Sequence, residues 1–573
     1  MERLNEIIKS LDKKPISKYK QLYGRYIKND MEFYIKNIYG SNIKYCTVEL
    51  AVFKEKLLGK YVYKKEDYVS VCSYILRDFS VLTYMMNEKM NLTESNIQKG
   101  YFLAYKYSQK VLPTTIVRAE EDKIIIRFDI KLPSAKTPSQ GKTIIMDKKS
   151  IFNEMENRKK GIISKHSLQI LFMKNMIKLA DEFVLNFNSE SLYEAVQLYK
   201  DQQYIREYLE KNNYVSFIGN GSILTRKGKT DYKNSKNVIP FKSPKTMEIN
   251  IKLPSGKNIA GMGIPEGITI ITGDAYHGKS TILNGIKNGI YNHYKDDGRE
   301  YVITRQDAMQ ICAEDGRSIK NVDISFFIPK APVDKINPLC FYTDCASGST
   351  SQAASVFEAI EAKCRLMIFD EDRSANNFMY KDDKIRKIIK NQTTRPYMDN
   401  AYMFYKNFGI STVMVVGAFG ECLKIADKVI IIDKFKAEEY KECFNQRQNN
   451  SYFLYNKKRF LKTDLLLENI KNRNIIIDKD IIKIGNECIY VSDIIPCATK
   501  GQISFVGAFL YYICTFGDFR KNFYEEIKRI YEKIDKNIFI LQQETKIGFS
   551  NLEYVRKEDM IALINRLRSI DFK

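Results

Sequence analysis

The sequence predicts an α/β fold with a parallel-sheet core, preceded by an α+β domain and followed by a helix-rich region. The core is indicated by short β-branched runs that alternate with helix-forming segments between residues 246 and 440. Residues 1–245 mix helical spacing with strand-like runs, and residues 441–573 are charged and helix-rich. These three ranges are therefore the expected domains.

The N-terminal range is expected to begin with helices. Residues 1 to about 110 read as mostly helical, because apolar side chains recur at helical spacing from Leu4 to Leu11. Strands are predicted over 114–117 and 123–132, and helix again over 155–209. The Tyr-rich stretch from Tyr19 to Tyr63 can stack nucleic-acid bases or simply pack as an amphipathic surface.

Positive charge is concentrated in the first part of the chain. Of the formal net charge of +23, residues 1–250 carry +16. Residues 211–245 hold eight basic residues and one acid, and the loop within them contains Arg226, Lys227 and Lys229. A polyanionic partner such as RNA or another nucleic acid explains this excess, with the three loop residues as candidate phosphate contacts. A lysine-rich coding bias and a solvated loop explain it equally well.

One glycine-containing turn has the spacing of a phosphate-binding loop. Residues Gly273 to Thr281 read G-x-x-x-x-G-K-S-T, after a strand-like run at 267–272 and before a helical segment at 281–287. Such a turn directs backbone N–H groups and a helix N-terminus at phosphates. Lys279 is then expected to reach the β- and γ-phosphates, and Ser280 to offer a hydroxyl to Mg²⁺. The turn predicts a nucleoside triphosphate site.

A second apolar run delivers two carboxylates. Residues 365–369 form a predicted strand that ends at Asp370 and Glu371, as in a Walker B motif, where one carboxylate supports the metal and the next activates water. A helix opens at Ser347-Gly348, 19 residues before Leu366. Further strands are predicted at 301–303, 322–328, 411–416 and 428–433, and a hairpin at 481–490.

The order of these segments resembles the bacterial and protist "predicted ATPase of the ABC class" family. The likeness covers most of the chain, is strongest from about 215 to 435, and rests on the motifs at 261–267, 276–281, 314–318, 346–354, 368–379 and 415–420.

This resemblance implies an ABC-type P-loop ATPase core that uses ATP and Mg²⁺ and pairs as a homodimer around two nucleotides. Asp370 and Ser280 would support the metal, and Glu371 would be the general base with Lys279 as the second catalytic residue. The residues that it assigns to the nucleotide are Gly273, Tyr276, His277, Gly278, Lys279, Ser280 and Thr281 in the loop, Ser347, Gly348 and Ser349 toward the partner's nucleotide, and Asn377 in the place of a D-loop aspartate.

Three features depart from transporter ATPases. No histidine follows the strand at 413–416, where a switch histidine is usual, and no aromatic residue lies between Phe241 and Tyr276, where a base-stacking ring is usual. No glutamine is placed as a Q-loop, and Glu314 is the expected substitute.

Two functions remain open at this point: an ATP-hydrolysing homodimer coupled to RNA or other nucleic acid, and a nucleic-acid-binding switch with slow or negligible turnover. A transporter subunit is disfavoured by the missing switch histidine, and a vestigial nucleotide site by the presence of Lys279, Asp370 and Glu371. No apolar run approaches the roughly 18 residues of a membrane helix, and the N-terminus has no secretory pattern. A cytoplasmic protein without a membrane partner is expected.

Overall fold

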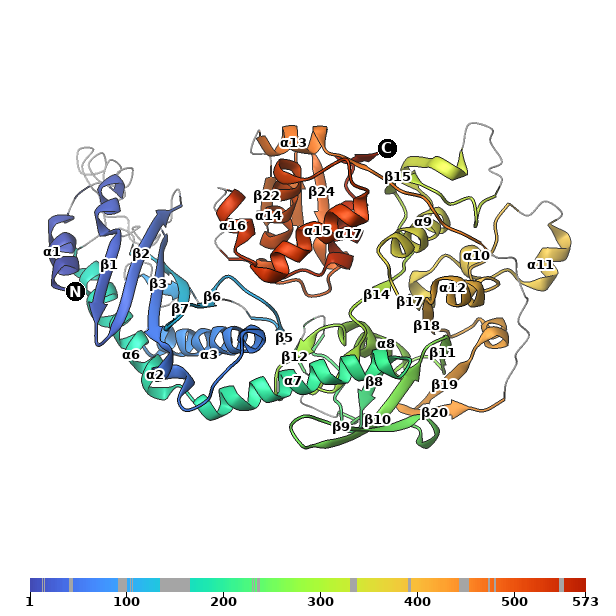
Figure 1. Ribbon diagram of the computed structural model, residues 1–573, viewed down its shortest axis with the longest axis horizontal. Coiled ribbons are helices and arrows are strands. Elements are labelled where there is room, and N and C mark those ends of the chain that lie inside the picture. The colour runs from blue at the N-terminus through green and yellow to red at the C-terminus, as the bar shows by residue number, and fades with distance from the viewer. Residues whose placement is uncertain are drawn as a thin grey trace, which may run out of the picture. The chain divides into compact units, whose positions relative to one another are not determined.

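The computed structural model describes the chain except residues 13, 15, 41–44, 91–99, 104, 106, 134–164, 229, 231, 234–237, 330–336, 390–392, 443–452, 472–474, 479–480 and 546–550 (Figure 1). The chain forms two compact units. Unit 1 contains residues 1–107 and 113–196, and unit 2 contains residues 108–112 and 197–573.

Unit 1 is built on an antiparallel sheet in the order β1-β2-β3-β7-β4, with β6 paired to β7. Its strands are β1 (Gly24–Lys28), β2 (Met31–Tyr39), β3 (Tyr45–Phe53), β4 (Tyr101–Leu103), β6 (Val117–Ala119) and β7 (Lys123–Lys131). The helical elements are α1 (Glu2–Ser10), η1 (Ile16–Leu22), α2 (Lys54–Leu58), η2 (Lys65–Asp67), α3 (Tyr68–Lys89), α5 (Lys165–Gln169), the π-helical η3 (Ile170–Asn175), α6 (Met176–Asn186) and the start of α7 (Ser189–Lys211).

The prediction of a mostly helical N-terminus is wrong for the described residues between 24 and 53, which contain three strands, β1, β2 and β3. Aromatic and β-branched side chains such as Phe33 and Val48 suit a pleated surface, and both are fully buried there. Phe79 of α3 joins the layers, because its ring lies 5.4 Å from that of Phe128 in β7 and 5.2 Å from that of Phe183 in α6.

Unit 2 contains the predicted parallel core. Its six-stranded sheet has the order β14-β17-β18-β11-β19-β20, parallel except for β20. The strands are β11 (Ile268–Thr272), β14 (Ala308–Gln310), β17 (Leu366–Asp370), β18 (Ser411–Val415), β19 (Lys428–Asp433) and β20 (Lys436–Tyr440). Because β11 lies between β18 and β19, the loop that follows it opens at the middle of the sheet.

An antiparallel sheet, β13-β8-β10-β9, accompanies this core. The elements around the two sheets are β5 (Lys110–Val111), β8 (Tyr214–Gly219), η4 (Lys245–Met247), β9 (Glu248–Lys252), β10 (Asn258–Pro265), α8 (Lys279–Asn288), β12 (Asn292–His293), β13 (Val302–Thr304), β15 (Arg317–Val322), η5 (Pro338–Cys340), β16 (Phe341–Ala346), α9 (Gly348–Glu361), η6 (Glu371–Arg373), α10 (Asn376–Met379), α11 (Asp383–Ile388), α12 (Ala401–Phe408) and η7 (Gly420–Ile425). Residues 197–245, assigned above to the N-terminal range, belong to unit 2, because β8 pairs with β10 and β13.

The strand predicted over 322–328 ends at Val322. Asp323 then accepts hydrogen bonds from the backbone N–H and hydroxyl of Ser325, which turns the chain. Phe326 and Phe327 are buried through aromatic contacts, including one with Phe357 of α9. The apolar run therefore reflects core packing of a turn.

The C-terminal region is helix-rich, as predicted, and contains the predicted hairpin. Its elements are β21 (Leu461–Lys462), α13 (Asp464–Lys471), β22 (Ile475–Asp478), β23 (Ile481–Ile484), β24 (Glu487–Tyr490), η8 (Val491–Asp493), α14 (Lys500–Phe516), α15 (Phe523–Lys536), α16 (Ile540–Thr545), α17 (Lys557–Ile564) and β25 (Asp571–Phe572). Within the described ranges, none of the helices has both the length and the apolar character that crossing a bilayer requires.

Candidate functional site

The loop between β11 and α8 has the backbone of a phosphate-binding turn. Gly273 adopts φ 145°, and a Cβ there would lie 2.2 Å from the carbonyl oxygen of Ile432. Gly278 adopts φ 104°, and a Cβ there would lie 2.9 Å from the ring of Phe435. Both positions therefore require glycine. Tyr276 also has a positive φ, 63°, and its side chain is 97% exposed.

The loop, the two carboxylates and the segment after β18 line one cavity of about 750 Å³. Lys279, the first residue of α8, lies in it and donates hydrogen bonds to the carbonyl oxygens of Gly273 (2.6 Å) and Asp274 (2.9 Å). The cavity brings together these predicted site residues: Gly273, Tyr276, Gly278, Lys279, Ser280, Thr281, Asp370 and Glu371. Seven residues that the prediction did not include also line it: Asp274, Ala275, Asp372, Val415, Gly417, Ala418 and Phe435.

Asp370 at the end of β17 is suited to bind a cation. Its Oδ1 is buried and has no hydrogen-bond partner among the residues that the structure describes. Burial raises the pKa of this carboxyl, and the neighbouring Asp372 raises it further. A divalent cation would compensate the buried negative charge, and the Ser280 hydroxyl on the same cavity could serve as a second oxygen ligand. The residues present therefore fit Mg²⁺.

Glu371 is oriented by backbone groups. Its Oε2 accepts hydrogen bonds from the N–H of Gly417 (2.5 Å) and of Ala418 (3.1 Å). These two residues follow β18 and Val416, in the segment where a switch histidine was expected and is missing. Two amide donors thus hold the carboxylate at the cavity, and its Oε1 remains available for a proton.

The helix start at Ser347 forms as predicted, but it does not line this cavity. Ser347 is the N-cap of α9, and its hydroxyl oxygen accepts a hydrogen bond from the Thr350 N–H (3.4 Å) and lies 3.3 Å from the Ser349 hydroxyl. Gly348 follows as the first helical residue. Asn377 lies in α10 with its side chain exposed. The cavity and this group are thus two separate parts of unit 2.

Gln352 of α9 links the two parts and was missed in the sequence. Its amide donates to the Ser374 hydroxyl (3.0 Å), and its carbonyl oxygen accepts from the Ala375 N–H (2.9 Å). Both partners follow the Asp370–Glu371 pair by a few residues. A buried glutamine in a small-residue helix carries no sequence signal of its own.

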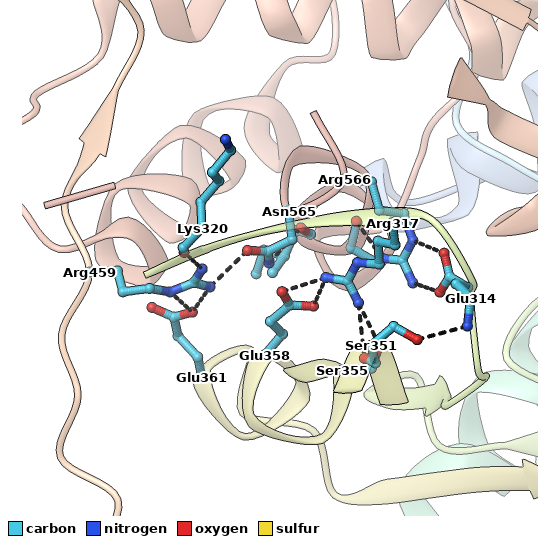
Figure 2. A network of polar contacts seen from close by, with 12 residues as sticks. Glu314, Arg317, Lys320, Ser351, Ser355, Glu358, Glu361, Arg459, Asn565 and Arg566 are labelled. Carbon is cyan, nitrogen blue, oxygen red and sulfur yellow. Dashed lines mark hydrogen bonds and ion pairs between the residues drawn. The ribbon is translucent and has the colours of Figure 1, made fainter. Parts of the chain in front are cut away.

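Arginine–carboxylate pairs fix α9 against the strands and the C-terminal region, as Figure 2 shows. The Nη2 of Arg317 in β15 donates to both carboxylate oxygens of Glu358 in α9, and its Nη1 donates to the Ser355 hydroxyl (2.6 Å). Arg459 pairs with Glu361 at the end of the same helix. All these side chains are almost fully buried, so both charges of each pair depend on their partner.

Glu314, the expected Q-loop substitute, belongs to this network. Arg566 from the end of α17 donates two hydrogen bonds to its carboxylate, one of them at 2.8 Å. Burial acts to raise the pKa of Glu314, but Arg566, Arg317 and Arg373 outweigh it and lower the pKa to about 2. The Glu314 N–H also donates to the Ser351 hydroxyl of α9 (2.8 Å). Glu314 is thus an ionised anchor.

The remaining predicted residues lie away from the cavity or outside the described chain. The Nδ1 of His277 lies 3.1 Å from the carboxylate of Asp433, so its ring points to the β19–β20 hairpin. Arg226 is nearly buried and paired with Asp297 at 2.7 Å. Lys227 is exposed. Lys229 lies outside the described residues.

A parallel sheet with a phosphate loop after its central strand, a Walker B carboxylate pair and a serine–glycine helix start defines a P-loop ATPase of the ABC class. Comparison with known families agrees, since three family models together match most of the chain: an N-terminal model of ATPases of the ABC class (residues 1–150), a P-loop domain model of ABC ATPases (188–463) and the MRB1590 C-terminal domain (476–573). The chain belongs to the family of ABC-class ATPases. The predicted fold class and the stated resemblance are confirmed.

One curated relative is the uncharacterized protein MJ1628 of Methanocaldococcus jannaschii, which is 35% identical over 208 residues. The match covers 35% of this chain and 46% of MJ1628, so the chain spans less than half of that protein.

Solved structures with a matching segment are ATP-binding cassettes of ABC transporters. MJ1267 in its ADP conformation is 12% identical, with a TM-score of 0.24, over 39% of this chain and 89% of that chain. CbiO1 of Clostridium perfringens is 16% identical, with a TM-score of 0.24, over 39% of this chain and 87% of that chain.

Proposed function

We propose that this chain hydrolyses ATP with Mg²⁺ as a homodimer, and that its ATP cycle is coupled to binding of RNA or another nucleic acid. The observation that carries the first part is the single cavity lined by the phosphate loop, Asp370 and Glu371. The unpartnered buried oxygen of Asp370 fits the metal. Members of the family generally use ATP and Mg²⁺.

The residues divide the chemistry as follows. Backbone N–H groups of the loop and Lys279 hold the phosphates, and Ser280 and Asp370 hold Mg²⁺, which supplies charge neutralisation when it is bound. Glu371 takes a proton from water as the water oxygen bonds to the γ-phosphorus. The bond from that phosphorus to the β–γ bridging oxygen breaks, which leaves ADP and inorganic phosphate. The N–H groups of Gly417 and Ala418 keep Glu371 aimed.

Homodimer formation is supported by the location of the α9 N-terminus. Ser347, Gly348 and Ser349 line no part of the cavity of their own chain, although the resemblance assigns them to a γ-phosphate. In this proposal, the three residues face the cavity of a second copy of the chain. Each nucleotide is then held between two copies. We also infer that the protein is located in the cytoplasm, because hydrolysis requires a compartment that supplies ATP.

The experiment for the enzymatic part is Mg²⁺-dependent phosphate release by the purified full chain. Lys279→Ala and Asp370→Asn are expected to abolish release, and Lys252→Ala, an exposed lysine of β9, is expected to leave it unchanged. Absence of ATP binding by the wild-type chain would contradict the proposal. ATP binding with negligible turnover would instead favour the slow nucleic-acid switch.

The coupling to nucleic acid rests on the excess charge of residues 1–250 and on the match to the MRB1590 C-terminal domain, which supports an RNA-related role. Lys227 and Lys229 are the loop residues proposed to contact phosphates, because the Arg226 guanidinium is engaged by Asp297.

A salt titration of RNA binding tests this coupling. The double change Lys227→Gln and Lys229→Gln is expected to lower the log–log salt slope by about 0.7 per lost contact to a single strand. The matched control changes two exposed lysines of the β9–β10 hairpin, Lys252 and Lys257, to glutamine. Equal slopes for wild type, variant and control would remove the loop from the RNA-binding proposal.

A further inference from the structure

A second, apolar pocket adjoins the phosphate cavity. It has a volume of about 140 Å³ and shares Gly278, Thr281 and Phe435 with the larger cavity. Its other lining residues are Leu224, Thr225, Ile239, Phe241, Ile282 and Ile432. An apolar cavity of about 150 Å³ is enough to hold benzene, so this pocket is large enough to take up part of a flat ring system beside the phosphate cavity.

The walls and the mouth of the pocket differ in exposure. Leu224, Phe241 and Ile282 are buried, whereas Ile239 is 52% and Phe435 49% exposed at the mouth. Among the described residues that line the pocket, two carry a polar side chain, and both are threonines, Thr225 and Thr281. Two half-exposed apolar side chains on different segments of the chain leave a slot whose surfaces are mostly carbon, and such a surface favours the face of an aromatic ligand.

Phe435 occupies a backbone position that ordinarily belongs to glycine or asparagine. Asp433 of β19 pairs with Lys436 of β20, which leaves Lys434 and Phe435 as a two-residue hairpin loop. Both have positive φ, 45° and 68°, as in a type I′ turn, for which Asn-Gly is the favoured pair. A phenylalanine in this conformation is strained. Backbone strain of this kind is typical of positions where the side chain has a function, here the phenylalanine ring at the pocket.

The hairpin is tied to the phosphate loop by two contacts. The Phe435 N–H donates to the His277 carbonyl oxygen (3.2 Å), and the His277 ring meets Asp433. The ring of Phe435 also packs so closely over Gly278 that a Cβ there would approach it to 2.9 Å. His277 thus positions the hairpin, and the hairpin holds the ring at a fixed place beside the loop.

We infer that this pocket receives the nucleobase of the nucleoside triphosphate and that the Phe435 ring stacks on it. This inference rests on the proposed function. The half-exposed ring at the mouth comes from Phe435, after the phosphate loop, whereas Phe241, the last aromatic residue before the loop region, lies buried in the wall. Since stacking on a carbon-lined wall uses the face of the base, loss of the ring weakens ATP and GTP alike.

The experiment compares nucleotide binding with binding of inorganic tripolyphosphate, which has no base, to the full chain with Mg²⁺. Phe435→Ala is expected to weaken ATP and GTP by about 5- to 150-fold and to leave tripolyphosphate affinity unchanged. Phe435→Tyr is expected to restore nucleotide affinity. The control is Phe516→Ala, which removes an exposed ring at the end of α14.

The outcomes separate this inference from the proposed function. Nucleotide affinity that is unchanged in Phe435→Ala, with tripolyphosphate still bound, overturns the base pocket alone. Equal weakening of nucleotide and tripolyphosphate also overturns it, because the change then acts through the phosphate loop. Failure of the wild-type chain to bind either ligand contradicts the proposed function itself.

Discussion

Replacing Glu371 by glutamine is expected to abolish most ATP turnover and to leave ATP binding intact. Glu371 accepts two backbone hydrogen bonds on one oxygen, from Gly417 and Ala418. The carbonyl oxygen of a glutamine accepts the same two bonds, so the side chain keeps its position. The substitution therefore removes the ability to take up a proton and little else.

The expected loss of turnover follows from the role of Glu371 as a proton acceptor, since its hydrogen bonds are kept. Loss of a general base costs about 10²–10⁴-fold in kcat, which is about 3–5 kcal/mol of transition-state stabilisation. Glu371→Asp keeps the carboxylate but withdraws it by one methylene from the two N–H donors, so its kcat is expected to lie between those of wild type and Glu371→Gln. The order of the three proteins separates proton transfer from orientation.

The assay is phosphate release at saturating ATP and Mg²⁺, with ATP affinity measured separately by equilibrium dialysis. Asp372→Asn is the matched control, because Asp372 is exposed, lines the same cavity and is the next carboxylate along the chain. The control is expected to retain most of its turnover. An unchanged kcat in Glu371→Gln, at unchanged ATP affinity, would refute the role of Glu371 as the base.

Three further predictions concern stability and assembly. Burial raises the pKa of Glu553 from 4.5 to about 7, so the stabilisation from its protonated carboxyl is complete below pH 4.5 and is lost as the pH rises through 7. Between pH 4.5 and pH 8, the free energy of unfolding of Glu553→Gln, measured with denaturant, should therefore rise by about 3 kcal/mol relative to that of wild type. Arg317→Met leaves Glu358 buried without its partner and should lower the free energy of unfolding by about 3–5 kcal/mol. The double variant with Glu358→Leu should recover most of this stability in thermal unfolding. In sedimentation, Glu371→Gln should dimerise only with ATP and Mg²⁺, because each nucleotide is part of the interface.

Each of these has a contradicting result. A stability difference for Glu553→Gln that does not change with pH would mean that the carboxyl titrates alike in the folded and unfolded chain. An Arg317→Met protein as stable as wild type would mean that Glu358 finds another partner or water. A monomer in both conditions would contradict the nucleotide-bridged dimer, and a dimer without ATP would mean that another surface joins the copies.

The nucleotide site could be predicted because its signals are local. The spacing from Gly273 to Ser280 and the run that ends at Asp370 each specify a strand and the loop beyond it within a few residues. Parallel strands buried on both faces also read as continuous apolar runs. The same reasoning failed over the strands at 24–28, 31–39 and 45–53, where interleaved tyrosines and lysines match helical and strand periods almost equally well.

The groups that complete the site carry no such signal. The two donors to Glu371 are backbone N–H groups, which every residue except proline possesses, so only the fold shows that those of Gly417 and Ala418 face this carboxylate. Phe435 lies more than 150 residues beyond the loop that it packs on. Its turn also lacks the glycine or asparagine by which such hairpins are recognised.

The same limit hides the dependence of the ATPase core on the C-terminal region. Arg566 and Arg459 come from beyond the core strands, yet they neutralise Glu314 and Glu361 within it (Figure 2). The residue before Glu314, Ala313, donates its N–H to the carbonyl oxygen of Arg373, two residues after Glu371 (2.8 Å). A displacement of Arg566 would therefore act on the segment beside the proposed hydrolytic site and, through the same network, on the helix proposed to face a partner's nucleotide. Because each buried carboxylate needs its arginine, the C-terminal region is a structural part of the ATPase core.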